Sequence, residues 1–505
     1  MSVKNKYLNP GSIFDASPAY LLLAVSGLSF CFFLGFPFEN HNESFLWIVI
    51  FSKVSFWDTL TKQVIPIESF RPLGVANAWL TYKLSGNIYL QQILNWLFAL
   101  ASFVLLFSVS RNKILFSLLS LAVCACFFAG YIYLFHLHGV FYGPFQLYVA
   151  GLTYIASKKR RLSSSLLAVI FVVTLFVALY HTFTLLVFCS FLSGYLLQLS
   201  KEEKKIQYIR LIILILFSLA LGKLILQAKS IKPLHELVDG LVTSFRMAEV
   251  NTALACIAAL LALLAAMPLI KSLSQRIITG LFILFLAAVL MYLHIPVLFL
   301  WIGICFVKVI LNKEMAMAGL IAATTILPVG SSSGSPTYTV FVLMVCAFVT
   351  TADEILYIPD SLLLRRLSVG FVALLFGMLA VIKIGFHVPL IASIARPVLA
   401  EQEKTSQLKN IIDWKLKNKE YAPATLVLYD AAGIPVAAKN SVDRTNRPVV
   451  SQDHLSNYVT FLSKDIATDT ITCFLYITFG NKILRGKQLV FSVNGPWNGK
   501  AYVYK

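Results

Sequence analysis

The chain has 505 residues, of which 58% are hydrophobic and 13% charged. This composition excludes a soluble globular protein and indicates a polytopic membrane protein. The net charge of +19 does not indicate a nucleic-acid partner, because the basic residues are spread over predicted cytoplasmic loops and the tail. Anionic lipid headgroups explain such a distribution better.

The first predicted membrane helix covers residues 19–36, with Lys4 and Lys6 keeping the N-terminus in the cytoplasm. No small-residue cleavage site accompanies it, so it is interpreted as an uncleaved anchor. The chain is then expected to stay outside to about residue 86. Within this loop, residues 45–60 are too short and interrupted to span, and they are predicted to lie in the membrane interface as an amphipathic helix.

Twelve further crossings are predicted from two rules. A membrane helix needs about 20 apolar residues, and short cytoplasmic loops are enriched in Lys and Arg. The apolar run 166–197 is too long for one helix, and both its flanks are basic, so it is predicted to be two helices that reverse outside near His181. The other crossings are predicted at 88–109, 115–135, 141–156, 208–226, 252–270, 277–292, 296–310, 317–327, 338–351 and 367–387. About thirteen crossings place the C-terminus outside.

All eight histidines fall on the external side of this topology or at external helix ends. Histidine prefers interfaces, so part of this bias is expected without any function. Ionisable groups at membrane depth nevertheless usually mark function, and the bias favours a polar external cavity. The histidines are His41, His136, His138, His181, His235, His294, His387 and His454.

The cysteines indicate neither disulfides nor zinc. Seven of the eight lie inside predicted helices, and only Cys473 lies in the tail. No metal site is expected on residue spacing, because the two imidazoles of His136 and His138 are not a complete ligand set. No cofactor is certain, and a divalent cation is left open.

Hydropathy drops near residue 396, which divides the chain into a membrane domain, 1–395, and a tail, 396–505. The tail predicts a small external α+β domain with a helix at 402–421. Its strands are predicted at 425–429, 436–438, 470–479 and 488–493. A turn at 494–499 carries Trp497, which either contacts a glycan or is simply a packed hydrophobic residue.

The first external loop holds the densest set of candidate catalytic residues. Glu39 and Glu43 follow the first crossing within a few residues, and Asp58 lies in the interfacial stretch. A carboxylate at the membrane surface can deprotonate an acceptor hydroxyl, while a nearby cation such as Arg71 stabilises a phosphate leaving group. Glu43 is equally well explained as a solvated loop charge. Glu39 is more constrained, because it lies closer to the hydrocarbon.

Further external side chains are candidates for binding a donor phosphate or an acceptor. Each of them is also compatible with a role as a headgroup anchor. These candidates are His41, Arg71, His136, His138, His181, His235, Arg246 and Arg396. A Gly/Ser loop at 328–336 needs no function beyond that of a connector. No Gly-rich nucleotide-binding pattern is present, so the energy must come from an activated donor or a gradient.

Around Glu39 the chain resembles the GT-C glycosyltransferases, which are multi-spanning enzymes that use polyprenyl-phosphate sugars and carry an acidic residue in the first external loop. It is most similar to bacterial serotype-converting O-antigen glucosyltransferases, which often carry Phe-Glu-Glu in that loop. Here the motif is Phe38-Glu39-Asn40, so the second Glu is absent. The resemblance is architectural along the chain and extends to a motif only around Glu39.

The resemblance implies an all-α polytopic membrane protein of GT-C type, with the α+β tail in the periplasm and the helices in a bacterial inner membrane. It implies transfer from a polyprenyl-phosphate sugar to a surface glycan of the O-antigen or lipopolysaccharide type. The expected partners are this donor, the acceptor and membrane lipids, with a small flippase and a donor synthase. The alternatives are an O-antigen polymerase or ligase, or a transporter or flippase of lipid-linked glycans.

Overall fold

The computed structural model describes fifteen main segments of the chain, together with short runs at 25, 51, 113, 211–212, 214–216, 218, 269–270 and 406–408. The segments are 54–62, 71–85, 89–110, 116–120, 139–158, 162–199 without 182, 252–266, 272–293, 297–330, 410–421, 424–428, 449–451, 474–479, 486–495 and 499–505. The chain divides into two compact units. One comprises Met1–Phe32, Asn95–Leu134 and Phe141–Gly385; the other comprises Phe33–Leu94, Phe135–Val140 and Phe386–Lys505. The domain boundary at residue 396 stays a prediction.

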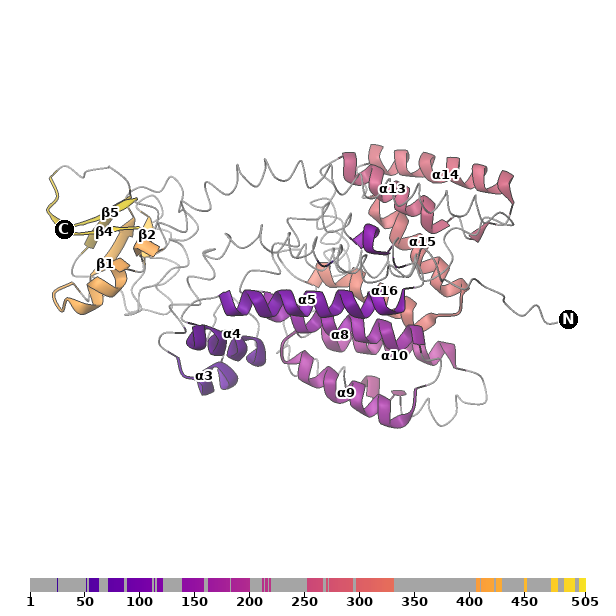
Figure 1. Ribbon diagram of the computed structural model, residues 1–505, viewed down its shortest axis with the longest axis horizontal. Coiled ribbons are helices and arrows are strands. Elements are labelled where there is room, and N and C mark those ends of the chain that lie inside the picture. Colours follow the sequence, from indigo (N-terminus) through magenta and orange to yellow (C-terminus); the bar gives the residue numbers. More distant parts are fainter. Residues whose placement is uncertain are drawn as a thin grey trace, which may run out of the picture. The chain divides into compact units, whose positions relative to one another are not determined.

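The first unit is helical in every element that is described (Figure 1). Most of these helices lie where the apolar runs predict crossings. The first residues of α5, before Asn95, belong to the other unit. The helices are α5 (Tyr89–Val109), α8 (Gly139–Lys158), α9 (Ser164–Ala178), α10 (Thr184–Gln198), α13 (Thr252–Ala266), α14 (Leu273–Tyr292), α15 (Leu298–Leu311) and α16 (Met315–Gly330).

The predicted reversal near His181 is confirmed, because α9 ends at Ala178 and α10 begins at Thr184. At the start of α9, the Ser163 hydroxyl caps the helix by accepting a hydrogen bond from the Leu166 amide. At its end, the His181 amide donates to the Val177 carbonyl at 2.9 Å and closes the last turn. The 166–197 run is therefore two helices.

One boundary differs from the prediction. Helix α16 continues to Gly330, three residues into the segment expected to be a Gly/Ser loop at 328–336. Its Pro328 is the third residue from the end of the helix. The rest of that loop lies outside the described residues.

Helices α10 and α16 approach each other through two glycines. A Cβ added to Gly194 of α10 would lie 2.7 Å from the carbonyl carbon of Met315, and one added to Gly319 of α16 would lie 2.9 Å from that of Ser190. Such separations are below any normal contact, so only glycine fits at either position. Small residues allow helix backbones to pack closely in a membrane, where apolar burial alone adds little.

Two side-chain hydrogen bonds join α8, α9 and α10 to one another. The hydroxyls of Tyr148 and Thr174 lie 2.7 Å apart and connect α8 with α9. The Tyr195 hydroxyl of α10 accepts a hydrogen bond from the Leu162 amide at 2.8 Å, just before α9 begins. All three of these side chains are buried, so each bond forms where water does not compete.

Two of the described helices are long and apolar enough to cross a membrane, spanning Leu90–Val109 and Leu273–Tyr292. Helices α9, α10 and α15 and part of α16 are apolar but shorter. The predicted count of thirteen crossings is not tested. On α14, the exposed large side chains include Ile278, Leu281, Phe282 and Phe285. An exposed apolar surface of this kind is typical of a face that contacts a membrane or another protein, and it agrees with an integral membrane protein.

The segment before α5 departs from the sequence prediction in two ways. Residues 45–60 were expected to form one helix, but Val54 and Ser55 are not helical and a separate helix, α3 (Phe56–Thr61), begins after them. The break occurs because the Ser55 side chain caps the new helix. A 14-residue helix, α4 (Pro72–Ser85), was not predicted. It was missed because it is shorter than a membrane crossing. Its first residue, Pro72, is a type that is common at the first position of a helix.

The tail contains a five-stranded sheet in the order β2-β1-β3-β5-β4. Strand β1 (Thr425–Leu428) is parallel to β2 (Val449–Ser451) and β3 (Phe474–Phe479), whereas β5 (Lys500–Tyr504) is antiparallel to β3 and β4 (Leu489–Asn494). Strands β1, β3 and β4 lie where they were predicted, whereas β2 and β5 were missed. The predicted strand at 436–438 lies outside the described residues.

A helix at 410–417 packs on one face of this sheet, as the α+β prediction requires. The hydrophobic core between them contains Ile411 and Ile412 of this helix, and Leu408 just before it. These side chains are buried together with Leu426, Ile477 and Val503 of the sheet. The Trp414 ring stacks on Phe491 of β4 with ring centres 4.5 Å apart. The helix and four strands therefore share one hydrophobic core.

The α10–α16 contact gives a direct test of the fold. We expect Gly194→Ala to lower the thermal unfolding temperature of the detergent-purified protein, because the added methyl group collides with backbone atoms of α16. The matched control is Gly303→Ala in α15, where no atom lies within 4 Å of the added Cβ and the unfolding temperature should be unchanged or higher. Equal effects of the two substitutions would contradict the contact.

Candidate functional site

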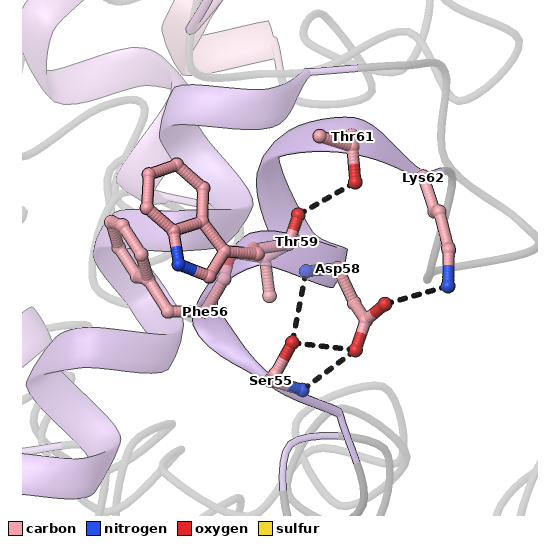
Figure 2. Close-up of polar contacts among 7 residues, drawn as sticks. Ser55, Phe56, Asp58, Thr59, Thr61 and Lys62 are labelled. Atoms are coloured by element: carbon pink, nitrogen blue, oxygen red, sulfur yellow. Dashed lines mark hydrogen bonds and ion pairs between the residues drawn. The ribbon is translucent and has the colours of Figure 1, made fainter.

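The Asp58 carboxylate is fully engaged at the start of α3 (Figure 2). Its Oδ2 accepts from the Ser55 amide at 3.0 Å and from the Ser55 hydroxyl at 2.7 Å, and its Oδ1 forms an ion pair with Lys62 at 2.7 Å. In return, the Asp58 amide donates to the Ser55 hydroxyl at 3.2 Å. This is a reciprocal helix cap extended by an ion pair one turn later.

These contacts decide how basic Asp58 is. The Lys62 ammonium first, and then the Ser55 hydroxyl and amide, hold the pKa of the Asp58 carboxyl well below its usual range. A carboxylate that binds protons so weakly is a poor general base near neutral pH, because the best base has a pKa close to the working pH. The predicted catalytic role of Asp58 stays untested, but its contacts assign it a structural role in α3.

Aromatic contacts fix α3 against α4. The Phe56 and Trp79 rings lie 5.7 Å apart, and the Trp79 indole donates to the Val54 carbonyl at 3.0 Å. The Lys83 ammonium lies 5.5 Å above the Trp79 ring, within the range of a cation–π contact. Asp58 is therefore held on a compact two-helix element rather than on a free loop.

Arg71 stands directly before α4. Its carbonyl accepts a hydrogen bond from the Val75 amide at 3.1 Å, and its side chain is half-buried. Asp58 and Arg71 thus lie on neighbouring elements of the same unit. Arg71 stands at the start of a helix, where the backbone amides of the first turn favour a nearby negative charge.

His181 was predicted to bind a phosphate or an acceptor, but its side chain is fully buried. Its ring lies 4.9 Å from that of Phe145 and 5.5 Å from those of Tyr142 and Phe183. Its carbonyl also accepts from the Thr184 amide and hydroxyl. His181 therefore sits in an aromatic cage at the α9–α10 reversal, and its binding role remains a prediction.

The other sequence candidates lie outside the described residues and stay predictions. These are Glu39, His41, Glu43, His136, His138, His235, Arg246 and Arg396. Trp497 lies outside them as well. Within the described part of the chain, no three His, Cys, Asp or Glu side chains gather in a way that could hold a metal ion.

The start of α5 carries polar side chains that the sequence analysis did not single out. Gln91 and Gln92 are both buried, and the amide of Gln91 lies 3.1 Å from the Thr81 hydroxyl of α4. The amide oxygen and nitrogen of Gln92 are buried and find no hydrogen-bond partner in the parts that the structure describes. A buried amide left in this state is a candidate for binding a hydroxyl. The sequence feature that could have indicated this position is the pair of adjacent Gln residues inside a predicted apolar crossing.

Comparisons with known proteins give a weak structural likeness only. No protein-family model matches the chain, and no curated protein matches its sequence. Two crystal structures of ArnT from Cupriavidus metallidurans are similar at 10% sequence identity. The apo structure gives a TM-score of 0.48 over 97% of this chain and 98% of that one; the structure bound to undecaprenyl phosphate gives 0.45 over 96% and 98%. Neither score reaches the level at which a likeness supports an argument.

Asp58 and Ser55 provide a matched pair of variants. Because Asp58 stays charged well below neutral pH, we expect Asp58→Asn to leave the acidic limb of the pH–activity profile where it is. Asp58→Asn and Ser55→Ala should both lower the thermal unfolding temperature. The first removes the ion pair with Lys62 and weakens the reciprocal cap, and the second removes the hydroxyl that caps α3. Loss of activity in Asp58→Asn but not in Ser55→Ala would instead identify Asp58 as a catalytic base.

Proposed function

We propose that this protein transfers a sugar from a polyprenyl-phosphate donor to a surface glycan of the O-antigen or lipopolysaccharide type, on the periplasmic face of a bacterial inner membrane. The observation that carries the proposal is the position of Glu39. It follows the first predicted crossing by three residues, in the sequence Phe38-Glu39-Asn40. A lipid-linked donor reaches an enzyme from within the bilayer, so the base must stand where helix ends meet headgroups.

Glu39 lies outside the described residues, and the proposal prefers it to the described candidates because of the contacts that those candidates make. The Asp58 carboxylate is held by Ser55 and Lys62, which weakens it as a base. The His181 ring lies in an aromatic cage. In the sequence, Glu39 precedes the α3–α4 pair, whose Phe56 and Trp79 rings are in contact.

The reaction that we propose needs one proton transfer and one displacement. The Glu39 carboxylate takes the proton of an acceptor hydroxyl, and that oxygen bonds to the anomeric carbon of the donor sugar. The bond from the anomeric carbon to the phosphate oxygen breaks, and the polyprenyl phosphate leaves with that electron pair. Arg71 and the external histidines are the groups proposed to offset the charge of this leaving phosphate. No nucleotide is consumed, in keeping with the absence of nucleotide-binding motifs.

Glu39→Gln tests the base directly. We expect it to lower sugar transfer by at least about 10²-fold, since general-base catalysis contributes about 10²–10⁴-fold. The amide keeps the size of the side chain but cannot accept a proton, so expression and donor binding should persist. The measurement is transfer of radiolabelled sugar from a polyprenyl phosphate by the purified protein in vesicles.

Glu43→Gln is the matched control, because it removes a second carboxylate of the same loop that lies further toward water. It should cost much less activity than Glu39→Gln. Near-normal turnover in Glu39→Gln, together with loss in Glu43→Gln, would move the base within the loop. Activity in both variants and in Asp58→Asn would contradict a carboxylate mechanism, and polymerisation or transport in place of single-sugar transfer would favour one of the alternative functions.

The periplasmic location of the site can be checked by reporter fusions. Reporters inserted after His138, after His294 and at the C-terminus should show external activity, whereas those after Arg161, Lys205 and Arg366 should show cytoplasmic activity. A cytoplasmic C-terminus would invert the last crossing and contradict a periplasmic tail. Paired reporters, one active only outside and one only inside, make each position its own control.

A further inference from the structure

Helices α3 and α4 expose large apolar side chains that nothing in the described structure covers. Trp57 of α3 is 71% exposed, and Leu84 and Leu80 of α4 are 71% and 44% exposed. Leu80 and Leu84 are four residues apart and lie on one face of α4, with Lys83 exposed beside them. Most large apolar residues of α3 and α4 do not share this exposure, because Phe56 and Trp79 pack against each other.

Neither helix can cross a bilayer. α4 has 14 residues and is therefore about 21 Å long, whereas a hydrocarbon core is about 30 Å thick. α3 has only 6 residues and carries a charged cap at its start. Their exposed apolar side chains must therefore be covered at the membrane surface or by another protein.

The charges of this element match those of a lipid surface. Lys62, Arg71 and Lys83 are its described cations, and Asp58 is its one described carboxylate. Lysines at a membrane interface extend their ammonium groups toward phosphates while their stems lie along apolar surface. Tryptophan also concentrates at the level of the headgroups, where its ring is apolar and its indole N–H is polar.

We propose that α3 and α4 together form a membrane-interface anchor, in which Trp57, Leu80 and Leu84 insert at the boundary between headgroups and acyl chains. Lys83, and the exposed Lys62 that also pairs with Asp58, then lie at the level of the lipid phosphates. The Ser55 cap, the Trp79–Val54 hydrogen bond and the Gln91–Thr81 hydrogen bond hold the element in shape. This anchoring does not depend on the proposed sugar transfer.

The test uses the full-length protein in vesicles of phosphatidylethanolamine with phosphatidylglycerol. The chain has seven tryptophans, so the emission of Trp57 is isolated as the difference between the wild type and Trp57→Phe. Quenchers are a nitroxide lipid labelled near the glycerol, a lipid labelled near the chain end, and aqueous iodide. We expect the shallow label to quench Trp57 about twice as strongly as the deep one, because interfacial side chains lie about 5–10 Å into the boundary.

The matched control is Trp301→Phe, which isolates a tryptophan that is fully buried in α15 and should respond little to aqueous iodide. Strong iodide quenching of Trp57 without lipid quenching would overturn the anchor, because the side chain would then face water. Stronger quenching by the deep label would overturn it in favour of insertion into the bilayer core.

A second variant, Leu84→Cys, separates lipid from protein as the covering partner, with the wild type as the baseline because the chain has eight cysteines of its own. If lipid covers this face, the thiol should react slowly with a charged aqueous maleimide and should form no disulfide-linked dimer on oxidation. Rapid dimer formation would identify a second copy of the chain as the partner and would contradict the proposal. Removing phosphatidylglycerol should weaken the shallow quenching of Trp57, since fewer anionic headgroups would face Lys62 and Lys83.

Discussion

Helices in hydrocarbon gain little from burying apolar side chains against each other, because lipid tails are equally apolar. What holds such helices together is close backbone packing and a small number of hydrogen bonds. Here Gly194 and Gly319 bring α10 and α16 into direct backbone contact, and Tyr148 and Tyr195 bond across to Thr174 and Leu162. Ten of the fifteen residues of α10 are buried, so most of this helix packs inside the protein, directly after the turn that holds His181.

Helices in long apolar segments could be predicted from the sequence, whereas short elements and strand pairing could not. The length of the 166–197 run correctly indicated two helices, and the alternating pattern of the tail indicated β1, β3 and β4. Helix α4 was missed because a search for crossings has no place for a 14-residue helix on the surface. Strand β5 was missed because it consists of few residues after a turn, and its formation depends on pairing with both β3 and β4.

The site could be predicted in part, and the errors have local causes. The spacing Ser55-x-x-Asp58 is a helix-start pattern that could have been recognised from sequence, and it explains why the Asp58 carboxylate is bound to its own backbone. The burial of His181 could not be recognised, because the aromatic rings around it come from α8 as well as from its own turn. Gln92 is a residue that the sequence analysis did not select. Its amide is recognised as a candidate only in the structure, where it is buried without a hydrogen-bond partner among the described residues.

These observations separate two uses of polar groups near a membrane surface. A carboxylate that already accepts two hydrogen bonds and an ion pair, as Asp58 does, stabilises a helix and loses basicity by the same contacts. A general base needs the opposite surroundings, namely partial desolvation without a fixed cation, so that its pKa stays near the working pH. On this reasoning the capped α3–α4 element is a support, and we propose that the base lies in the loop ahead of it. The proximity of Glu39 to the predicted first crossing fits that requirement better than the position of Asp58 does.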